Sequence, residues 1–366
     1  MVGLGDLGGW VLEFLARTPG VKNIVTADIN EKWGTSKTNN ARLNAAHAGL
    51  YPNMSFKKID LNNLDGAAET IKEIEPDIIY SGVTLQSWWA NDELLHGRNL
   101  ELETGYGPWG VPFNLPLAHK LVKAVRKSGT KPLVVNSSFP DAVNPILGKL
   151  GLAPTVGLGN MDLIVPRVQL VVAEKLGVPP NNVKVFMVAH HVSAANLYEA
   201  RSIGEAPYYM KVLVGDRDVT KDLPPHRIFE EAFPVPTGRS IHPTVASSAV
   251  KNMLAMMNDT GELTHAPGPN GLIGGYPVRL SAKGADVFLP EGLEMGEAIR
   301  INEEAQKFDG IEKINEDGSV VFTDKAYQMM RDVIGYDCKK LEVKDSEQRA
   351  EELRSLYLDF VKKLKH

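Results

Sequence analysis

Short apolar runs alternate with helix-like segments along the first 157 residues. The strand-like runs are NIVTAD, MSFKKID, DIIYSGV, KPLVVNSS and TVGLGN, and helical segments such as LPLAHKLVKAVRKSG separate them. Strands that alternate with helices predict an α/β fold with a parallel, doubly wound sheet. We therefore expect a first domain over residues 1–157. Only Met1 and Val2 precede the glycine-rich turn, whereas such strands usually have about five residues, so either the opening strand is short or the true start of the chain lies upstream.

The pattern changes after residue 157. A helix with one apolar face carries Arg167 and ends at Gly177, and a strand-like run follows at residues 185–189. A late helix (HPTVASSAVKNMLAMMNDTG), further strands and a closing helix come next. The chain ends in an amphipathic helix with one apolar stripe, formed by Leu353, Leu356, Tyr357, Phe360 and Leu364. We expect an α+β domain over residues 158–366, with this stripe packed on the body or on a partner subunit.

Composition and charge exclude several classes of protein. The 366 residues carry a formal net charge of −5 and a pI near 6.0, so nucleic acid is not an expected partner. No apolar run approaches the ~20 residues that span a bilayer, and no signal-peptide pattern opens the chain. Cys338 is the only cysteine, which excludes an intramolecular disulfide and a CxxC metal cluster. A cytoplasmic protein without a membrane partner is expected.

The opening residues MVGLGDLGG contain the pattern G-x-G-x-x-G at Gly3, Gly5 and Gly8. Gly3 allows a tight turn, Gly5 lets the backbone approach a pyrophosphate, and Gly8 lets helix and strand pack closely. The following helix begins with Asp6 and Leu7, and a helix N-terminus attracts anions. These residues predict a dinucleotide site.

Three further residues are expected at this site, each at the end of a strand. Asp28 ends NIVTAD about twenty residues after Gly8, where its carboxylate would bind ribose hydroxyls and repel a 2′-phosphate. This acid makes NAD, rather than NADP, the expected cofactor. Gly82 follows the strand that ends at Tyr80, where a cofactor crosses the sheet edge. Asn136 ends the next strand, either facing the nicotinamide or serving as a turn or capping residue.

The stretch VFMVAHHVSAAN, residues 185–196, places two histidines at the end of a strand. Adjacent side chains on a strand point to opposite faces, so one of His190 and His191 is expected to face a site. Both are also consistent with hydrogen-bonded packing residues. In a dinucleotide-binding fold one of them gains a task, because a neutral imidazole takes the hydroxyl proton as hydride leaves carbon.

The segment RVQLVVAEKLGVPPNNVKVFMVAHH, with the late helix and strands after it, resembles the lactate/malate dehydrogenase superfamily. The resemblance implies a Rossmann domain followed by a catalytic domain, with NAD as cofactor, and a homodimer or homotetramer is expected. It makes His191 the catalytic acid/base, with His190 as the remaining candidate. It also makes Arg167 the residue that binds a substrate carboxylate, and it puts Thr244 in the substrate pocket.

The same resemblance offers Asp162 as the acid that orients His191. Asp162 stands five residues before Arg167, whereas the family's acid stands three before its arginine, where this chain has Ile164. Glu199 and Glu205 are the alternative partners of the histidine.

Aromatic residues dominate the loop after the fourth strand. The loop carries Trp88, Trp89, Tyr106 and Trp109 and only one arginine, Arg98, where the family's dicarboxylate enzymes have arginines. Aromatic faces suit stacking on an extended or ring-shaped substrate, or packing within the loop or at a subunit interface. Trp89 is therefore a candidate substrate-binding residue, and a monocarboxylate is the expected substrate.

Together these features predict an NAD-dependent oxidoreductase that transfers a hydride between a 2-hydroxy acid or sugar acid and the nicotinamide. Two alternatives stay open. The chain also resembles, more distantly, the NAD-dependent glycoside hydrolase family 4, whose metal-binding cysteine stands in a motif similar to GLGN at residues 157–160; here Gly159 replaces it. His190, His191 and His242 have no fixed ligand spacing, and no metal is expected. The second alternative is an NAD-sensing protein that has lost catalysis.

Overall fold

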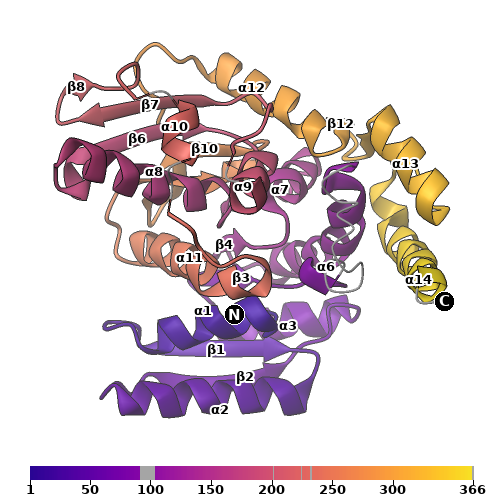
Figure 1. The fold of residues 1–366 in the computed structure, drawn as a ribbon. Helices are drawn as coiled ribbons and strands as arrows, with labels where there is room; N and C mark the ends of the chain where they lie inside the picture. The colour runs from indigo at the N-terminus through magenta and orange to yellow at the C-terminus, as the bar shows by residue number, and fades with distance from the viewer. Residues whose placement is uncertain (91–103, 201, 224, 231–232, 365–366) are drawn as a thin grey trace.

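The computed structural model describes residues 1–90, 104–200, 202–223, 225–230 and 233–364 (Figure 1). Its helices are α1 (Asp6–Ala16), α2 (Glu31–His47), α3 (Leu64–Ile74), α6 (Gly107–Ser128), α7 (Pro140–Lys149), α8 (Met161–Leu176), α9 (His191–Ala200), α10 (Pro225–Glu230), α11 (His242–Met257), α12 (Met295–Phe308), α13 (Asp324–Ile334) and α14 (Ser346–Leu364). Short 3-10 helices are η1 (Pro180–Asn182), η2 (Gly238–Ile241), η3 (Pro269–Gly271) and η4 (Val343–Asp345). The strands are β1 (Asn23–Asp28), β2 (Asn53–Lys58), β3 (Ile78–Ser81), β4 (Leu133–Asn136), β5 (Val156–Gly157), β6 (Val183–Val188), β7 (Tyr209–Val214), β8 (Arg217–Asp218), β9 (Glu262–Pro267), β10 (Gly275–Ser281), β11 (Gly284–Val287), β12 (Ile311–Ile314), β13 (Val320–Phe322) and β14 (Lys340–Leu341).

The first half of the chain forms the predicted parallel sheet. β1 pairs with β2, β3 with β4, and β4 with β5, all in parallel. Val2 joins the two groups through bridges to Ala27 and Ser81, and its N–H donates to the Tyr80 carbonyl at 2.9 Å. The order is therefore β2-β1-Val2-β3-β4-β5, in which Val2 occupies the place of the first strand of a Rossmann sheet. The prediction of a doubly wound α/β sheet is confirmed.

The second half adds antiparallel sheets that bring the histidine pair to the parallel sheet. β6 pairs with β7 and β7 with β8, while β10 lies between β9 and β11. Ala189, directly after β6, bridges Gly275 at the start of β10. α8 packs on β6, and α11 packs on α1 of the first half. This packing holds His190 and His191 near the carboxyl edge of the Rossmann sheet.

The C-terminal residues pack on α6, as Figure 1 shows for α13 and α14. One face of α14 is buried through Leu353, Tyr357 and Val361, and the Tyr357 ring lies 5.6 Å from that of Trp109. The predicted apolar stripe is thus confirmed, and it packs on the body of the same chain. The Leu364 side chain lies outside the described residues.

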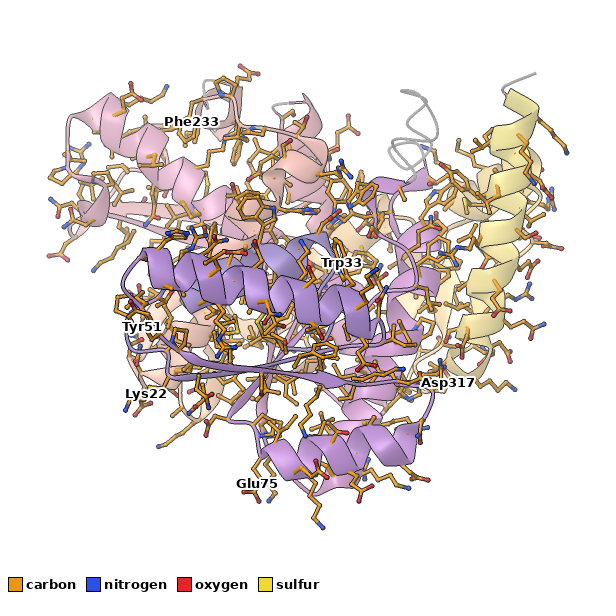
Figure 2. All side chains as sticks on the ribbon, turned by 90° about the horizontal axis from the view of Figure 1, so that it is seen from below. Lys22, Trp33, Tyr51, Glu75, Phe233 and Asp317 are labelled. Carbon is orange, nitrogen blue, oxygen red and sulfur yellow. The ribbon has the colours of Figure 1, made fainter. Side chains whose placement is uncertain are left out.

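Lys22, Glu75 and Asp317 are examples of charged side chains on the outside of the molecule (Figure 2). In the described part of the chain, every helix is too short or too polar to cross a lipid bilayer.

His265, in β9, is one of the polar side chains that are buried. Its Nε2 accepts a hydrogen bond from the Met187 N–H at 3.2 Å, which requires the neutral imidazole. Burial, aided by Lys251, lowers the pKa of His265 to about 3. In the unfolded chain the same side chain takes up a proton near pH 6.5. Acid therefore favours the unfolded state between these two values.

We predict that replacing His265 by glutamine removes part of the pH dependence of stability. The wild-type protein is expected to lose about 2 kcal/mol of unfolding free energy through this histidine between pH 7 and pH 5, because the unfolded state binds the extra proton. Urea unfolding of wild type and His265→Gln at both pH values measures the difference. His47→Gln, at an exposed position, is the control that keeps the wild-type dependence. Equal pH dependence in all three proteins would contradict the prediction.

Candidate active site

A cavity of about 720 Å³ lies at the carboxyl edge of the Rossmann sheet. Its walls come from both halves of the chain: the glycine-rich turn, the ends of β3 and β4, the first turn of α9 and the segment before α11. The residues that line the cavity include Gly5, Asp6, Leu7, Gly8, Gly82, Thr84, Trp88, Trp89, Tyr106, Asn114, Ser137, Ser138, Phe139, Asn160, His191, Tyr198, Ile241, His242, Val245 and Asp309. A ligand in this cavity would therefore contact both halves.

The glycine-rich turn has the geometry that a pyrophosphate requires. A Cβ on Gly3 would lie 2.6 Å from the Gly82 carbonyl oxygen, and one on Gly8 would lie 2.1 Å from the Gly3 carbonyl oxygen. These two glycines therefore allow close packing of backbone on backbone. At Gly5 a Cβ would have no atom within 4 Å, so this position leaves space on the cavity side. Gly5 is also the N-cap of α1 and brings no side-chain cap, which leaves the first-turn N–H groups to bind an anion.

Asp28 lies beside this turn. Its Oδ2 accepts a hydrogen bond from the Leu4 N–H at 2.8 Å, and its Oδ1 accepts one from the Asn30 N–H at 2.9 Å. The carboxylate is thus fixed at the end of β1, next to the cavity lining rather than within it. In a Rossmann sheet this is the place of the adenosine ribose.

Asn136 has the role of a turn residue, which was the alternative expectation, and a position facing the cofactor is not supported. Its Nδ2 donates to Asn144 Oδ1 at 2.9 Å, and its Oδ1 accepts from the Ser138 N–H at 3.1 Å. The side chain is buried and does not line the cavity, because these bonds turn it into the loop after β4. Ser137 and Ser138 line the cavity in its place.

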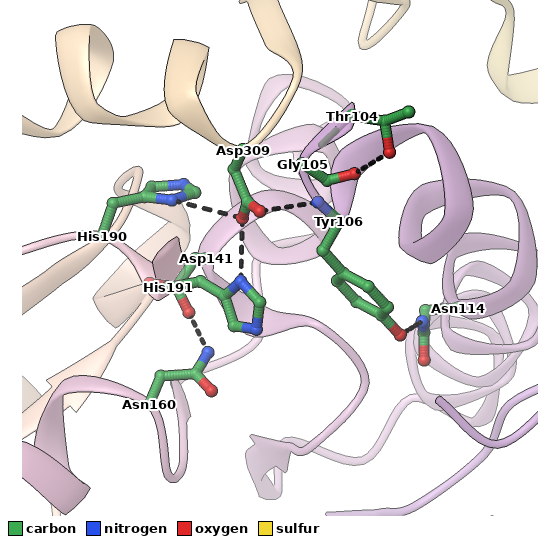
Figure 3. A network of polar contacts seen from close by, with 9 residues as sticks. All are labelled: Thr104, Gly105, Tyr106, Asn114, Asp141, Asn160, His190, His191 and Asp309. Atoms are coloured by element: carbon green, nitrogen blue, oxygen red, sulfur yellow. Dashed lines mark hydrogen bonds and ion pairs between the residues drawn. The ribbon is translucent and has the colours of Figure 1, made fainter. Parts of the chain in front are cut away.

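The two histidines meet at one buried carboxylate, Asp309 (Figure 3). His191 Nδ1 lies 2.8 Å from Asp309 Oδ2, and His190 Nδ1 lies 3.5 Å from the same oxygen. Asp309 Oδ1 accepts the Tyr106 N–H at 2.8 Å. The His191 side chain is 20% exposed and lines the cavity, whereas that of His190 is fully buried. His191 is therefore the histidine that a substrate can reach.

Electrostatics assign the protons in this cluster. Burial works against ionisation of Asp309, but the charges of His191 and His190 and the hydrogen bonds from His191 and Tyr106 hold its pKa below the usual value. An ionised carboxylate only accepts hydrogen bonds, so the Nδ1 of His191 carries the hydrogen. Burial lowers the pKa of His190, which keeps that imidazole neutral at pH 7. Burial also raises the pKa of Asp141, whose Oδ2 accepts a hydrogen bond from the Asn160 amide.

The structure corrects the expected partner of His191. Asp162 is buried on α8, where it accepts hydrogen bonds from Ser248 Oγ and Lys251 Nζ, both at 2.5 Å. The Asp162 carboxylate thus forms an ion pair with Lys251 and does not contact His191. Glu205 is exposed, and the Glu199 side chain lies outside the described residues. Asp309 takes this place, and sequence reasoning missed it because Asp309-Gly310 has the composition of an ordinary turn.

Arg167 and Thr244 are also placed differently from expectation. Arg167 is buried, its Nη2 donates to the Phe233 carbonyl at 2.6 Å, and its guanidinium lies 5.7 Å from the Tyr198 ring. It is not among the residues that line the cavity. Thr244 is exposed, because the first turn of α11 points other residues into the cavity, namely Ile241, His242 and Val245.

The four aromatic residues that were expected in one loop divide into two groups, and Trp109 lies within α6. Trp88, Trp89 and Tyr106 line the cavity; Trp88 lies edge-on to His242 at 6.0 Å, and the Tyr106 ring lies 5.3 Å from that of His191. Trp109 is instead buried against α14, which is the packing role among the two expected for these aromatics. Arg98 lies outside the described residues.

A metal centre finds no support in the described part of the chain. There, no group of three or more histidine, cysteine, aspartate or glutamate side chains is able to hold a metal ion.

Comparison with known proteins gives matches in structure only. No family model and no curated protein matches the sequence. A lactate dehydrogenase from a Medee basin deep-sea metagenome library is similar with a TM-score of 0.57, 14% identity and coverage of 84% of this chain and 95% of that chain. Malate dehydrogenase from Plasmodium falciparum gives a TM-score of 0.56 and 15% identity over 96% of this chain and 97% of that chain. Lactate dehydrogenase from Eimeria maxima, solved with NADH and oxamate, gives 0.56 and 14% over 83% and 89%. The chain therefore has the fold of the lactate and malate dehydrogenases, at a sequence identity of 14–15% to these three structures.

Proposed function

We propose that this protein is an NAD-dependent dehydrogenase that acts on a CH–OH group, with His191 as the acid/base. The observation that carries the proposal is the 2.8 Å contact between His191 Nδ1 and Asp309, in the wall of a cavity that begins at a glycine-rich turn. The similarity in fold to the Eimeria maxima lactate dehydrogenase, which was solved with NADH, supports the choice of cofactor.

The residues around the glycine-rich turn fit a dinucleotide. Gly5 leaves space for the pyrophosphate, the first turn of α1 offers N–H groups to it, and Asp28 lies where ribose hydroxyls need an acceptor. When bound, NAD supplies a nicotinamide ring that takes up a hydride from the substrate carbon.

His191 handles the proton that accompanies the hydride. Its Nδ1–H is held by Asp309, so a proton from the substrate hydroxyl would enter at Nε2. The ionised Asp309 then faces an imidazolium and stabilises the charge that develops in the transition state. In the reverse direction the same imidazolium returns the proton to a carbonyl oxygen. Asp309 is thus a positioning residue, because it acts through the histidine.

The expected carboxylate on the substrate does not enter this proposal. That expectation depended on Arg167, whose guanidinium is engaged with the Phe233 carbonyl and is not part of the cavity lining. Assembly as a homodimer or homotetramer stays a prediction.

The glycine-rich turn yields a prediction with a built-in contrast. Gly5→Ala is expected to fold normally, because its Cβ meets no atom within 4 Å, but to weaken NADH binding about tenfold by occupying the pyrophosphate space. Gly8→Ala is expected to destabilise the fold by about 1–3 kcal/mol, because its Cβ would overlap the Gly3 carbonyl. Thermal unfolding and NADH fluorescence titration separate the two effects. A folded Gly5→Ala protein with wild-type NADH affinity would remove the cofactor assignment.

The histidine pair yields a second contrast. His191→Asn is expected to lower kcat by about 100-fold or more, because the general base is lost. His190→Asn is expected to be much milder, since His190 is buried and does not line the cavity. Both variants should keep wild-type NADH affinity, and kcat is measured on the best substrate of a panel of alcohols and hydroxy acids. If the two effects were reversed, His190 would be the catalytic histidine.

The carboxylate of Asp28 predicts a preference for NADH over NADPH in direct binding measurements, because it repels a 2′-phosphate. Asp28→Ser combined with Ile29→Arg is expected to shift the preference towards NADPH; serine keeps one acceptor for the loop N–H groups, and Ile29 is exposed. Ile29→Arg alone is the control. Equal wild-type affinities for the two cofactors would rule out this role of Asp28.

A further inference from the structure

We propose that the cavity takes a neutral, hydroxyl-rich substrate, such as a polyol or an aldose, rather than a carboxylate. This inference rests on the proposed dehydrogenase function and names the substrate class of the same site. Three features of the cavity lead to it: the charge of its lining, the hydrogen-bonding state of its polar side chains and its aromatic faces.

The described residues that line the cavity include no lysine and no arginine. The acids in the lining are Asp6 and Asp309, and the histidines are His191 and His242. Burial lowers the pKa of His242, so it adds no positive charge at pH 7. A carboxylate that enters such a site loses its hydration without gaining a cation, and that transfer is costly.

Two described arginines lie close to this region, and neither side chain is in the cavity lining. Arg167 is buried behind the lining and donates to the Phe233 carbonyl. Arg239 is exposed, with its guanidinium 4.7 Å from the centre of the Trp89 ring, and it is outside the lining. Trp89 therefore contributes an aromatic ring to the lining, whereas the positive charge beside it belongs to the exposed side chain of Arg239.

Three polar side chains in the lining donate hydrogen bonds to the protein itself. Asn114 Nδ2 donates to the Gly110 carbonyl at 2.8 Å and to the Tyr106 hydroxyl at 3.3 Å, and Thr84 Oγ1 donates to the Gln86 carbonyl at 2.7 Å. Asn160 Nδ2 donates to Asp141. Figure 3 shows Asn160 on one side of His191, and Asn114 beyond the Tyr106 ring.

These side chains also offer acceptor oxygens, because an amide retains its Oδ1 and a hydroxyl its lone pairs. A substrate that meets acceptors must bring donors. Hydroxyl groups bring them, and a carboxylate has none.

The aromatic faces complete the match. Trp88, Trp89 and Tyr106 line the cavity next to these acceptors. The C–H faces of a sugar ring or polyol chain pack against aromatic rings, while the hydroxyls at the edge form hydrogen bonds with polar groups. Apolar faces and acceptor oxygens, in a described lining without lysine or arginine, suit a neutral carbohydrate-like molecule.

The test compares matched pairs that differ in one terminal carbon: glycerol with glycerate, xylitol with xylonate, and glucose with gluconate. With NAD in excess, the neutral member of at least one pair is expected to show a kcat/KM at least tenfold above that of its acid. The same compounds are added to the NADH complex, where the neutral member is expected to raise the thermal midpoint and the acid is not.

A matched pair of variants ties the effect to the cavity. Trp89→Ala is expected to raise KM for the neutral substrate about tenfold, because a stacking face in the lining is lost. Trp10→Ala, an exposed tryptophan outside the lining, is expected to leave KM unchanged.

The outcomes separate this inference from the proposed function. Preference for the acid in every pair, or stabilisation of the NADH complex by neither member, would overturn the substrate class while NADH binding still supports a dinucleotide enzyme. Failure of the wild-type protein to bind NADH would instead contradict the proposed function, and the substrate class would fall with it.

Discussion

The site depends on one buried ion, the carboxylate of Asp309. Burying a charge costs several kcal/mol unless hydrogen bonds and opposite charge compensate for it. Here the compensation comes from two parts of the chain that are remote from Asp309 in sequence: the Tyr106 N–H, at 2.8 Å, and the imidazole of His191, also at 2.8 Å. These contacts compensate for the buried charge, and they also fix the orientation of the His191 imidazole.

The same carboxylate makes the C-terminal part of the chain a component of the site. Asp309 stands in the turn between α12 and β12, and β12 begins the segment that packs on α6. The backbones of the two segments touch: a Cβ on Gly105 would lie 2.2 Å from the Asp309 carbonyl carbon, and one on Gly310 would lie 2.4 Å from the Thr104 carbonyl oxygen. Packing of α14 on α6 thus supports the contact that holds His191.

Local patterns predicted the elements but not the pairings between them. The glycine spacing and the alternation of strands and helices were enough to predict the parallel sheet. The partner of His191 was out of reach, because Asp309 lies 118 residues later in a turn whose composition is ordinary. Asp162 was misassigned for the same reason, since Lys251, which pairs with it, lies 89 residues away. Which charged side chains pair depends on how the helices pack. On α11 the neighbouring residues Thr244 and Val245 lie on different faces, so that Thr244 is exposed and Val245 lines the cavity.

The chemistry of the cavity follows from where the fold uses its cations. Lys251 neutralises Asp162 in the layer between α8 and α11, and Arg167 donates to a carbonyl behind the lining. Neither charge is then available to a ligand, because moving one would leave a buried acid or carbonyl without its donor. The described lining of the cavity offers acceptor oxygens, aromatic faces and a histidine that is hydrogen-bonded to the Asp309 carboxylate. A shared dehydrogenase fold can therefore carry a site whose polarity differs from that of an anion-binding enzyme, since the fold determines where the histidine stands and the distribution of cations determines what it meets.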